Sequence, residues 1–321
     1  MKKTMFLVAT LVLISSFVSN VSAEEDTLKI VCTTSILADF TSNLVKENVT
    51  IEYIMPAGVC PAYYDTTPSD VGKITDADII ISFGDSKMEH WLSDLLDYNE
   101  NYSLIECKDL GEWNIPSGAK KYVEQLESAL SEILVEQNDT IHSNAETYLS
   151  EIDEMAETLK NSVQTKGYDN TKIICMAWQK DFLEWLGLNV TYSYGPPQTL
   201  SAQDQLAVIN ASTSQDVYAI VDNLQSGTDF GGSVASESGA SHVIFTNFPE
   251  ALPGTDTYFE MVEYNTEQLI KGIETYEYKQ GEISALQGQI SGLETQRNIS
   301  LFASIVFVIL SLVMYMLYKK K

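Results

Sequence analysis

The sequence predicts an α/β protein with two lobes, each a parallel sheet with flanking helices, joined by one long helix. Short apolar runs alternate with helix-forming segments on both sides of the middle of the chain, and such alternation builds parallel sheets. An uninterrupted amphipathic segment, 140–166, separates the two series. A final apolar run, 299–318, is long enough to cross a membrane.

The central segment has the helical period. Its apolar residues recur three or four positions apart, and no Gly or Pro interrupts them. Asn138 and Asp139 can cap its start, and Gly167 can end it. A coiled-coil dimer would give the same pattern, but the stripe is short for one. We therefore expect a connecting helix, 138–166, of roughly 40 Å.

The first lobe, 24–137, opens on a short buried strand whose end is followed by a helix-capping Thr-Thr-Ser. A segment dense in turn formers, 56–70, leads into the next helix. Another helix begins near Glu89. Strands are expected at 28–32, 49–55, 78–83 and 104–107.

The second lobe, 167–277, repeats this order. Strands are expected at 172–175, 190–193, 217–221 and 242–245, and helices at 182–186, 202–211, 232–238 and 257–276. Parallel sheets bind ligands at the carboxyl ends of their strands, so we expect a cleft shared by the two lobes.

Both ends of the chain carry targeting signals. Residues 1–23 read as a signal peptide, with Lys2 and Lys3 before an apolar run and a small-residue cleavage site at 21–23. A retained membrane helix is the alternative. No cysteine follows this run, so an amino-terminal lipid anchor is not expected. The uncharged run 299–318 precedes a cytoplasmic tail, 319–321, of three lysines. We expect a single-pass cell-membrane protein with its bulk outside the cell.

A stalk, 278–298, joins the body to this anchor. Ile283, Leu286, Ile290 and Leu293 are spaced as in a coiled-coil seam. Three glycines in the stalk, at 281, 288 and 292, weaken the helix. A self-associating stalk and a simple spacer are both consistent with this pattern.

Composition narrows the choice of partners. The formal charge is −26, which argues against nucleic acid as a ligand. The acidic surface can concentrate cations, although adaptation to a salty medium would produce the same balance. N-glycosylation sequons suit an exported glycoprotein and begin at Asn48, Asn101, Asn138, Asn189, Asn210 and Asn298.

Four cysteines remain, at Cys32, Cys60, Cys107 and Cys175, and none has the spacing of a zinc ribbon or a dithiol redox motif. They are interpreted as core residues or as partners in one or two disulfides. The sequence contains no nucleophile elbow, P-loop, zinc-protease or dinucleotide motif, so we do not expect an enzyme.

Several segments, in this order and spacing, resemble the extracellular solute-binding proteins of zinc and manganese ABC importers. The resemblance covers about 28–274. The resemblance is strongest in the loop 60–70, Cys-Pro-Ala-Tyr-Tyr-Asp-Thr-Thr-Pro-Ser-Asp. Further matching segments are 77–81, 89–92, 113–116 and 255–265. The resemblance implies a two-lobed binder that holds a metal ion, without an organic cofactor, and presents it to a permease and its ATPase.

The family's usual ligands are mostly replaced. Matched to the family pattern, two ligating histidines fall on Ala62 and Gly111, the third ligand falls on Met176, and only Asp256 remains. One carboxylate cannot satisfy zinc, which takes about four ligands. Cys60 and Met176 offer sulfur, which favours soft ions such as copper(I). We therefore expect a metal site of Asp256, Met176 and Cys60, with apolar packing of Met176 as the alternative.

Cleft-lining residues are expected beside this site, at Tyr63, Tyr64, Cys175, Trp178 and Tyr258. Aromatic residues near strand ends also suit an organic ligand or a chelated metal. The leading hypothesis is a membrane-tethered solute-binding protein for a transition metal. A surface adhesion or interaction protein that keeps the fold and has lost transport is the alternative.

Overall fold

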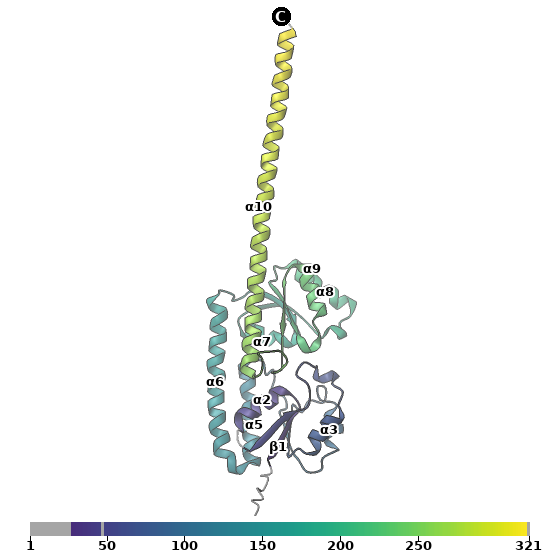
Figure 1. Ribbon diagram of the computed structural model, residues 1–321, viewed down its shortest axis with the longest axis vertical. Coiled ribbons are helices and arrows are strands. Elements are labelled where there is room, and N and C mark those ends of the chain that lie inside the picture. The colour runs from purple at the N-terminus through teal and green to yellow at the C-terminus, as the bar shows by residue number, and fades with distance from the viewer. Residues whose placement is uncertain (1–26, 46–47, 320–321) are drawn as a thin grey trace, which may run out of the picture. The chain divides into compact units, whose positions relative to one another are not determined.

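The computed structural model describes residues 27–45 and 48–319 (Figure 1). The expected signal peptide and the last two tail lysines lie outside these residues. The chain forms two compact units. The first comprises residues up to Pro56, Pro61–Leu110 and Lys121–Leu149, and the second comprises Ala57–Cys60, Gly111–Lys120 and the residues from Ser150 onward.

The first lobe is built on a four-stranded parallel sheet with the order β2-β1-β3-β4. Its strands are β1 (Leu28–Cys32), β2 (Val49–Tyr53), β3 (Ile79–Ser82) and β4 (Ser103–Glu106). The central strand β3 is buried along its whole length. A parallel strand covered on both faces reads as a continuous apolar run, which is why the sequence identified it.

Aromatic side chains join the helices of the first lobe. Phe40 on α2 (Ser35–Leu44) lies 6.2 Å, between ring centroids, from Tyr122 on α5 (Pro116–Ile133). It also lies 6.3 Å from Tyr148 on α6 (Asn138–Thr165). Helices α3 (Pro68–Thr75) and α4 (Leu92–Leu96) contact each other. Short 3-10 turns occur at Pro61–Tyr63, Val135–Gln137, Ala177–Gln179, Pro197–Thr199 and Leu224–Ser226.

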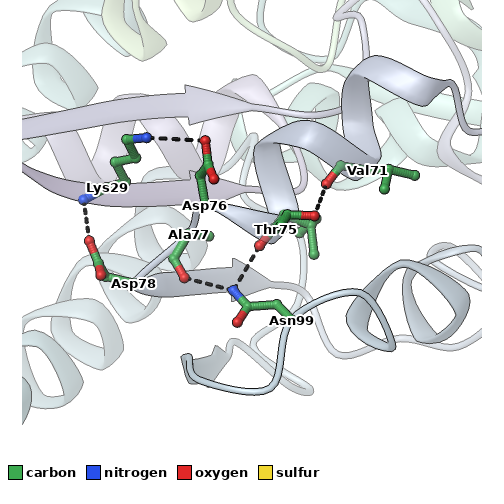
Figure 2. Close-up of polar contacts among 8 residues, drawn as sticks. Lys29, Val71, Thr75, Asp76, Ala77, Asp78 and Asn99 are labelled. Carbon is green, nitrogen blue, oxygen red and sulfur yellow. Dashed lines mark hydrogen bonds and ion pairs between the residues drawn. The ribbon is translucent and has the colours of Figure 1, made fainter.

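Polar contacts fix the turn that precedes β3, at the amino end of the sheet (Figure 2). The Lys29 backbone N–H donates to Asp78 Oδ2 at 2.8 Å, and the Lys29 ammonium lies 3.3 Å from Asp76 Oδ2. Asn99 Nδ2 donates to the Ala77 carbonyl at 2.8 Å. These bonds satisfy the Lys29 N–H of β1 and the Ala77 carbonyl between α3 and β3, at the end of the sheet opposite the carboxyl ends of its strands.

The second lobe repeats the sheet. Strands β5 (Lys172–Met176), β6 (Asn189–Tyr194), β7 (Ala219–Asn223) and β8 (Ser241–Phe245) are parallel, in the order β6-β5-β7-β8. The predicted parallel α/β fold in two lobes is therefore confirmed. The register of β5 and β6 shifts between Ile173 and Ile174.

Helices cover both faces of this second sheet. Val208 of α8 (Ala202–Ser214) and Val234 of α9 (Asp229–Ser238) pack into one core with Ile174 and Ile220. The alternate residues of each strand point to the other face of the sheet. There Phe182 of α7 (Lys180–Trp185) lies 5.9 Å from Phe245, between ring centroids.

Two helices pass from one unit to the other. The expected connecting helix is α6, and the division between the units falls within it, after Leu149. Helix α5 was not among the predicted helices. Its apolar stripe (Ala119, Tyr122, Val123, Leu126 and Leu130) is fully or almost fully buried. Pro116 at its start ends the 113–116 segment that supports the family resemblance, and proline is common at the first position of a helix.

The last helix, α10 (Tyr258–Lys319), is one unbroken helix of 62 residues (Figure 1). Its first turns pack on β7 and β8, where a Cβ at Gly272 would overlap Val243. The stalk segment continues as helix through Gly281, Gly288 and Gly292. Among the described residues, α10 is the one helix long and apolar enough to cross a membrane.

Candidate functional site

The loop 60–70 of the first lobe is held by its own aromatic and capping residues. Trp91 Nε1 donates to the Pro61 carbonyl at 3.2 Å, and the Tyr64 ring packs edge-on against Trp91. Tyr64 O–H donates to Asp70 Oδ2 at 2.7 Å, and the same oxygen accepts the Thr67 N–H in a capping box for α3. Burial, together with Asp70, raises the pKa of Tyr64.

The two tyrosines expected to line a cleft therefore differ. Tyr64 is buried within its loop, whereas 59% of Tyr63 is exposed. Tyr63 is the one of the pair that is available to a ligand.

The carboxyl end of β5 places its residues in the core. Met176 is fully buried beside Ile174, Val208 and Tyr194. Cys175 precedes it on the strand, so its side chain points to the opposite face, where it is also fully buried. Burial raises the pKa of the Cys175 thiol, which keeps it protonated. The next turn carries Trp178, with 44% of the residue exposed.

Asp256 lies at the start of α10 and is exposed. Its backbone N–H donates to Glu260 Oε2 at 2.9 Å, as does that of Thr257 at 3.1 Å, so Glu260 caps the helix. The Asp256 carboxylate takes no part in these two bonds. Tyr258, two residues later, is fully buried.

All four cysteines are free thiols. Cys32, Cys107 and Cys175 are buried, and Cys60 is partly exposed. Burial raises the pKa of both Cys32 and Cys107 to about 12. The disulfides considered from the sequence are not formed, and the three buried thiols serve as apolar core groups.

The described part of the chain contains no group of three or more His, Cys, Asp or Glu side chains placed to hold a metal ion. The expected ligands Cys60, Met176 and Asp256 all belong to the second unit. As described above, they occupy a partly exposed loop, the core and an exposed helix start. Whether they bind a metal stays a prediction.

A network of amide side chains at the carboxyl ends of β5, β7 and β8 was missed by the sequence reasoning. Gln179 Nε2 donates to Asn247 Oδ1 at 2.8 Å, and Trp113 Nε1 donates to the Asn247 carbonyl at 2.7 Å. Gln225 Nε2 donates to the Ala57 carbonyl at 2.8 Å. Residues 57–60 and 111–120, which carry Ala57 and Trp113 of this network, fall in the second unit.

The second unit also contains buried polar atoms without a hydrogen-bond partner. Neither Asn114 Oδ1 nor its Nδ2 has a hydrogen-bond partner, and only 1% of the residue is exposed. Gln179 Oε1 is likewise buried without a partner. Beside them, burial and then the charge of Asp181 raise the pKa of Glu112 to about 7. Amide side chains two or three residues after the ends of β5, β7 and β8 are the sequence signal for this network.

A second polar network lies within the second sheet. Asp222 is fully buried on β7. Tyr194 O–H donates to its Oδ1 at 2.6 Å, and His242 Nε2 lies 2.8 Å from its Oδ2. Gly231 of α9 packs directly on this carboxylate. His242 is thus a hydrogen-bonded residue.

Comparisons with known proteins agree with this architecture. The family model described as "Zinc-uptake complex component A periplasmic" matches residues 30–272. The manganese-binding lipoprotein MntA of Halalkalibacterium halodurans is 25% identical over 249 residues, which cover 70% of this chain and 81% of that protein.

Two solved structures show the same fold. A periplasmic metal binding protein from Candidatus Liberibacter asiaticus matches with a TM-score of 0.66 at 20% identity, covering 77% of this chain and 99% of that one. A crystal structure of ZnuA matches with a TM-score of 0.64 at 18% identity, covering 75% and 98%.

Proposed function

Because the chain belongs to the periplasmic zinc-uptake component A family, whose members bind a solute for ABC importers, we propose that it captures a transition-metal ion outside the cell. A permease and its ATPase would receive the ion. The observation that carries the proposal is the family match over 30–272, which spans both parallel sheets. The manganese-binding name of the MntA relative supports a metal as cargo.

The proposed ligands are Asp256, Cys60 and Met176. Asp256 is exposed and Cys60 is partly exposed, so both can meet an ion from solvent. Met176 would have to leave its core contacts with Ile174 and Val208, and it is the weakest member of the set. A carboxylate with two sulfur ligands suits zinc or copper(I) better than manganese, which prefers oxygen.

We propose α10 as the membrane anchor. Its segment from Ile299 to Tyr318 carries no charge, and none of the residues in the most apolar part of the helix is buried. At 1.5 Å per residue, twenty residues span about 30 Å, the thickness of the hydrocarbon core. Truncation after Arg297 should release the protein into the medium, whereas the full chain should stay with the membrane through an alkaline wash.

Metal analysis after anaerobic purification tests the binding function. We expect about one equivalent of zinc, copper or manganese per chain, with most of it lost in Asp256→Asn and Cys60→Ser. Met176→Leu preserves the core volume and removes the thioether, so it separates ligation from packing. Loss of metal with unchanged stability would identify a ligand. Unchanged metal content would assign Met176 to the core.

One observation favours a second function. Ala62 and Gly111, where the family resemblance places histidines, offer no ligating side chain, and the described residues form no metal-holding group of His, Cys, Asp or Glu. A surface interaction protein that has lost transport would lack these metal ligands. A purified chain without metal, whose thermal stability ignores every added divalent ion and copper(I), would support that function and refute metal capture.

A further inference from the structure

The stalk segment of α10, 278–298, makes no packing contacts that bury it within its own chain. Every one of its residues is exposed. Its three glycines each cost a helix about 1 kcal/mol relative to alanine. Most helical stability in proteins comes from packing of an apolar face. A helix of this composition therefore calls for a partner along its length.

The apolar face of the stalk has the geometry of a two-stranded coiled coil. The apolar residues follow a heptad repeat, with spacings of three, four and three residues. In this repeat the a positions are Ile283 and Ile290, and the d positions are Leu286 and Leu293. β-Branched a residues with leucine at d favour parallel dimers over higher oligomers. The four side chains are 46–66% exposed. In this heptad frame Gly281, Gly288 and Gly292 occupy c and f positions, away from the seam.

Charge permits two copies to approach at this segment. The whole chain carries a net charge of −26, which makes its copies repel one another. The stalk is the exception, since Lys279 and Arg297 balance Glu282 and Glu294. In a parallel pair, each g-position residue faces the e position five residues along the partner. Glu282 would face Gln287, and Gln289 would face Glu294, so no like charges meet.

We infer that two copies of this chain pair through the stalk as a short parallel coiled coil with Ile283, Leu286, Ile290 and Leu293 as its seam. The parallel orientation rests on the membrane anchor proposed above, which sets both helices in one direction. Two heptads form a short interface. Confinement to one membrane raises the effective concentration of the partner and compensates for the small area.

Cysteine cross-linking in membranes tests the pairing with the full chain. In a Cys60→Ser background, which leaves only buried thiols, single cysteines replace Leu286 and Ile290 on the seam. The matched controls are Ser284 and Ser291, both at b positions on the outer face. Mild oxidation should give at least about fivefold more disulfide-linked dimer at the seam positions than at the controls.

Equal cross-linking at all four positions would indicate random collision and overturn the inference. Cross-linking of the seam to a different protein instead of a second copy would also overturn it. An Ile290→Ser change should reduce cross-linking from a cysteine at Leu293. An alkaline wash tests the anchor separately. A chain that washes off yet keeps the seam pattern would refute the anchor and retain the pairing.

Discussion

Gly231 occupies a position where even one methyl group has no room. An ideal Cβ there would overlap Asp222 Oδ2 and lie 2.5 Å from Cγ. The Asp222 carboxylate cannot retreat, because it is fully buried and held by Tyr194 and His242. Gly231→Ala must therefore displace the carboxylate and weaken both hydrogen bonds.

The expected loss follows from these contacts. Each hydrogen bond to a charged group contributes about 1.5–3 kcal/mol, and an overpacked methyl costs about 1–3 kcal/mol. Alanine recovers about 1 kcal/mol of helix propensity. We expect a net loss of about 2–4 kcal/mol in the free energy of unfolding. Urea titration followed by tryptophan fluorescence measures it, since Trp113, Trp178 and Trp185 report on the second unit.

Two controls make the reasoning refutable. Gly72 lies inside α3 with no atom near its missing Cβ, so Gly72→Ala should stabilise the first lobe by up to about 1 kcal/mol. In an Asp222→Ala background the collision partner is gone, and Gly231→Ala should be neutral or stabilising. An equal loss with and without Asp222 would show that the carboxylate is not the cause.

Three further predictions concern the surroundings of Asn247 in the second unit and the loop 60–70. Burial opposes the ionisation of Glu112, so the free energy of unfolding should fall as pH rises from about 4.5 to about 7. Glu112→Gln should abolish that fall and raise the free energy of unfolding by at most about 3 kcal/mol at pH 8. A pH profile unchanged by this substitution would refute it. Trp113→Phe retains an aromatic ring beside Phe248 but removes the bond to Asn247 and part of the buried ring, and urea titration should show a loss of at least about 1–2 kcal/mol. An unchanged stability would contradict a role for that bond. Tyr64→Phe removes one of the donors to buried Asp70 and should lower the melting temperature by several degrees; an unchanged value would mean that the Thr67 donors suffice.

The strands of both lobes could be predicted because their sequence pattern follows directly from their burial. β3 and β7 are buried at every position, and each begins with three apolar residues in a row. Helix α5 was not predicted, although its apolar stripe, like that of α6, has the helical period. Its burial depends on aromatic partners, such as Phe40 and Phe83, that are distant in sequence.

The candidate site was harder to predict, for a different physical reason. Sequence reasoning started from metal-ligating residue types, and these include Met176 and Cys175. In the structure β5 extends to residue 176, so the two side chains point to opposite faces of the sheet and both are buried. The amide network around Asn247 contains none of those types. Amides are common in turns, so only the fold shows that Gln179, Gln225 and Asn247 converge.

The free cysteines bear on how the protein can be produced and handled. No covalent cross-link has to form during folding, so the chain can be expressed in a reducing compartment and purified with reductant throughout. Three thiols are shielded by the core, which leaves Cys60 as the natural attachment point for a fluorophore or spin label. A reporter there would sit on the loop before Ala62 without any engineered residue.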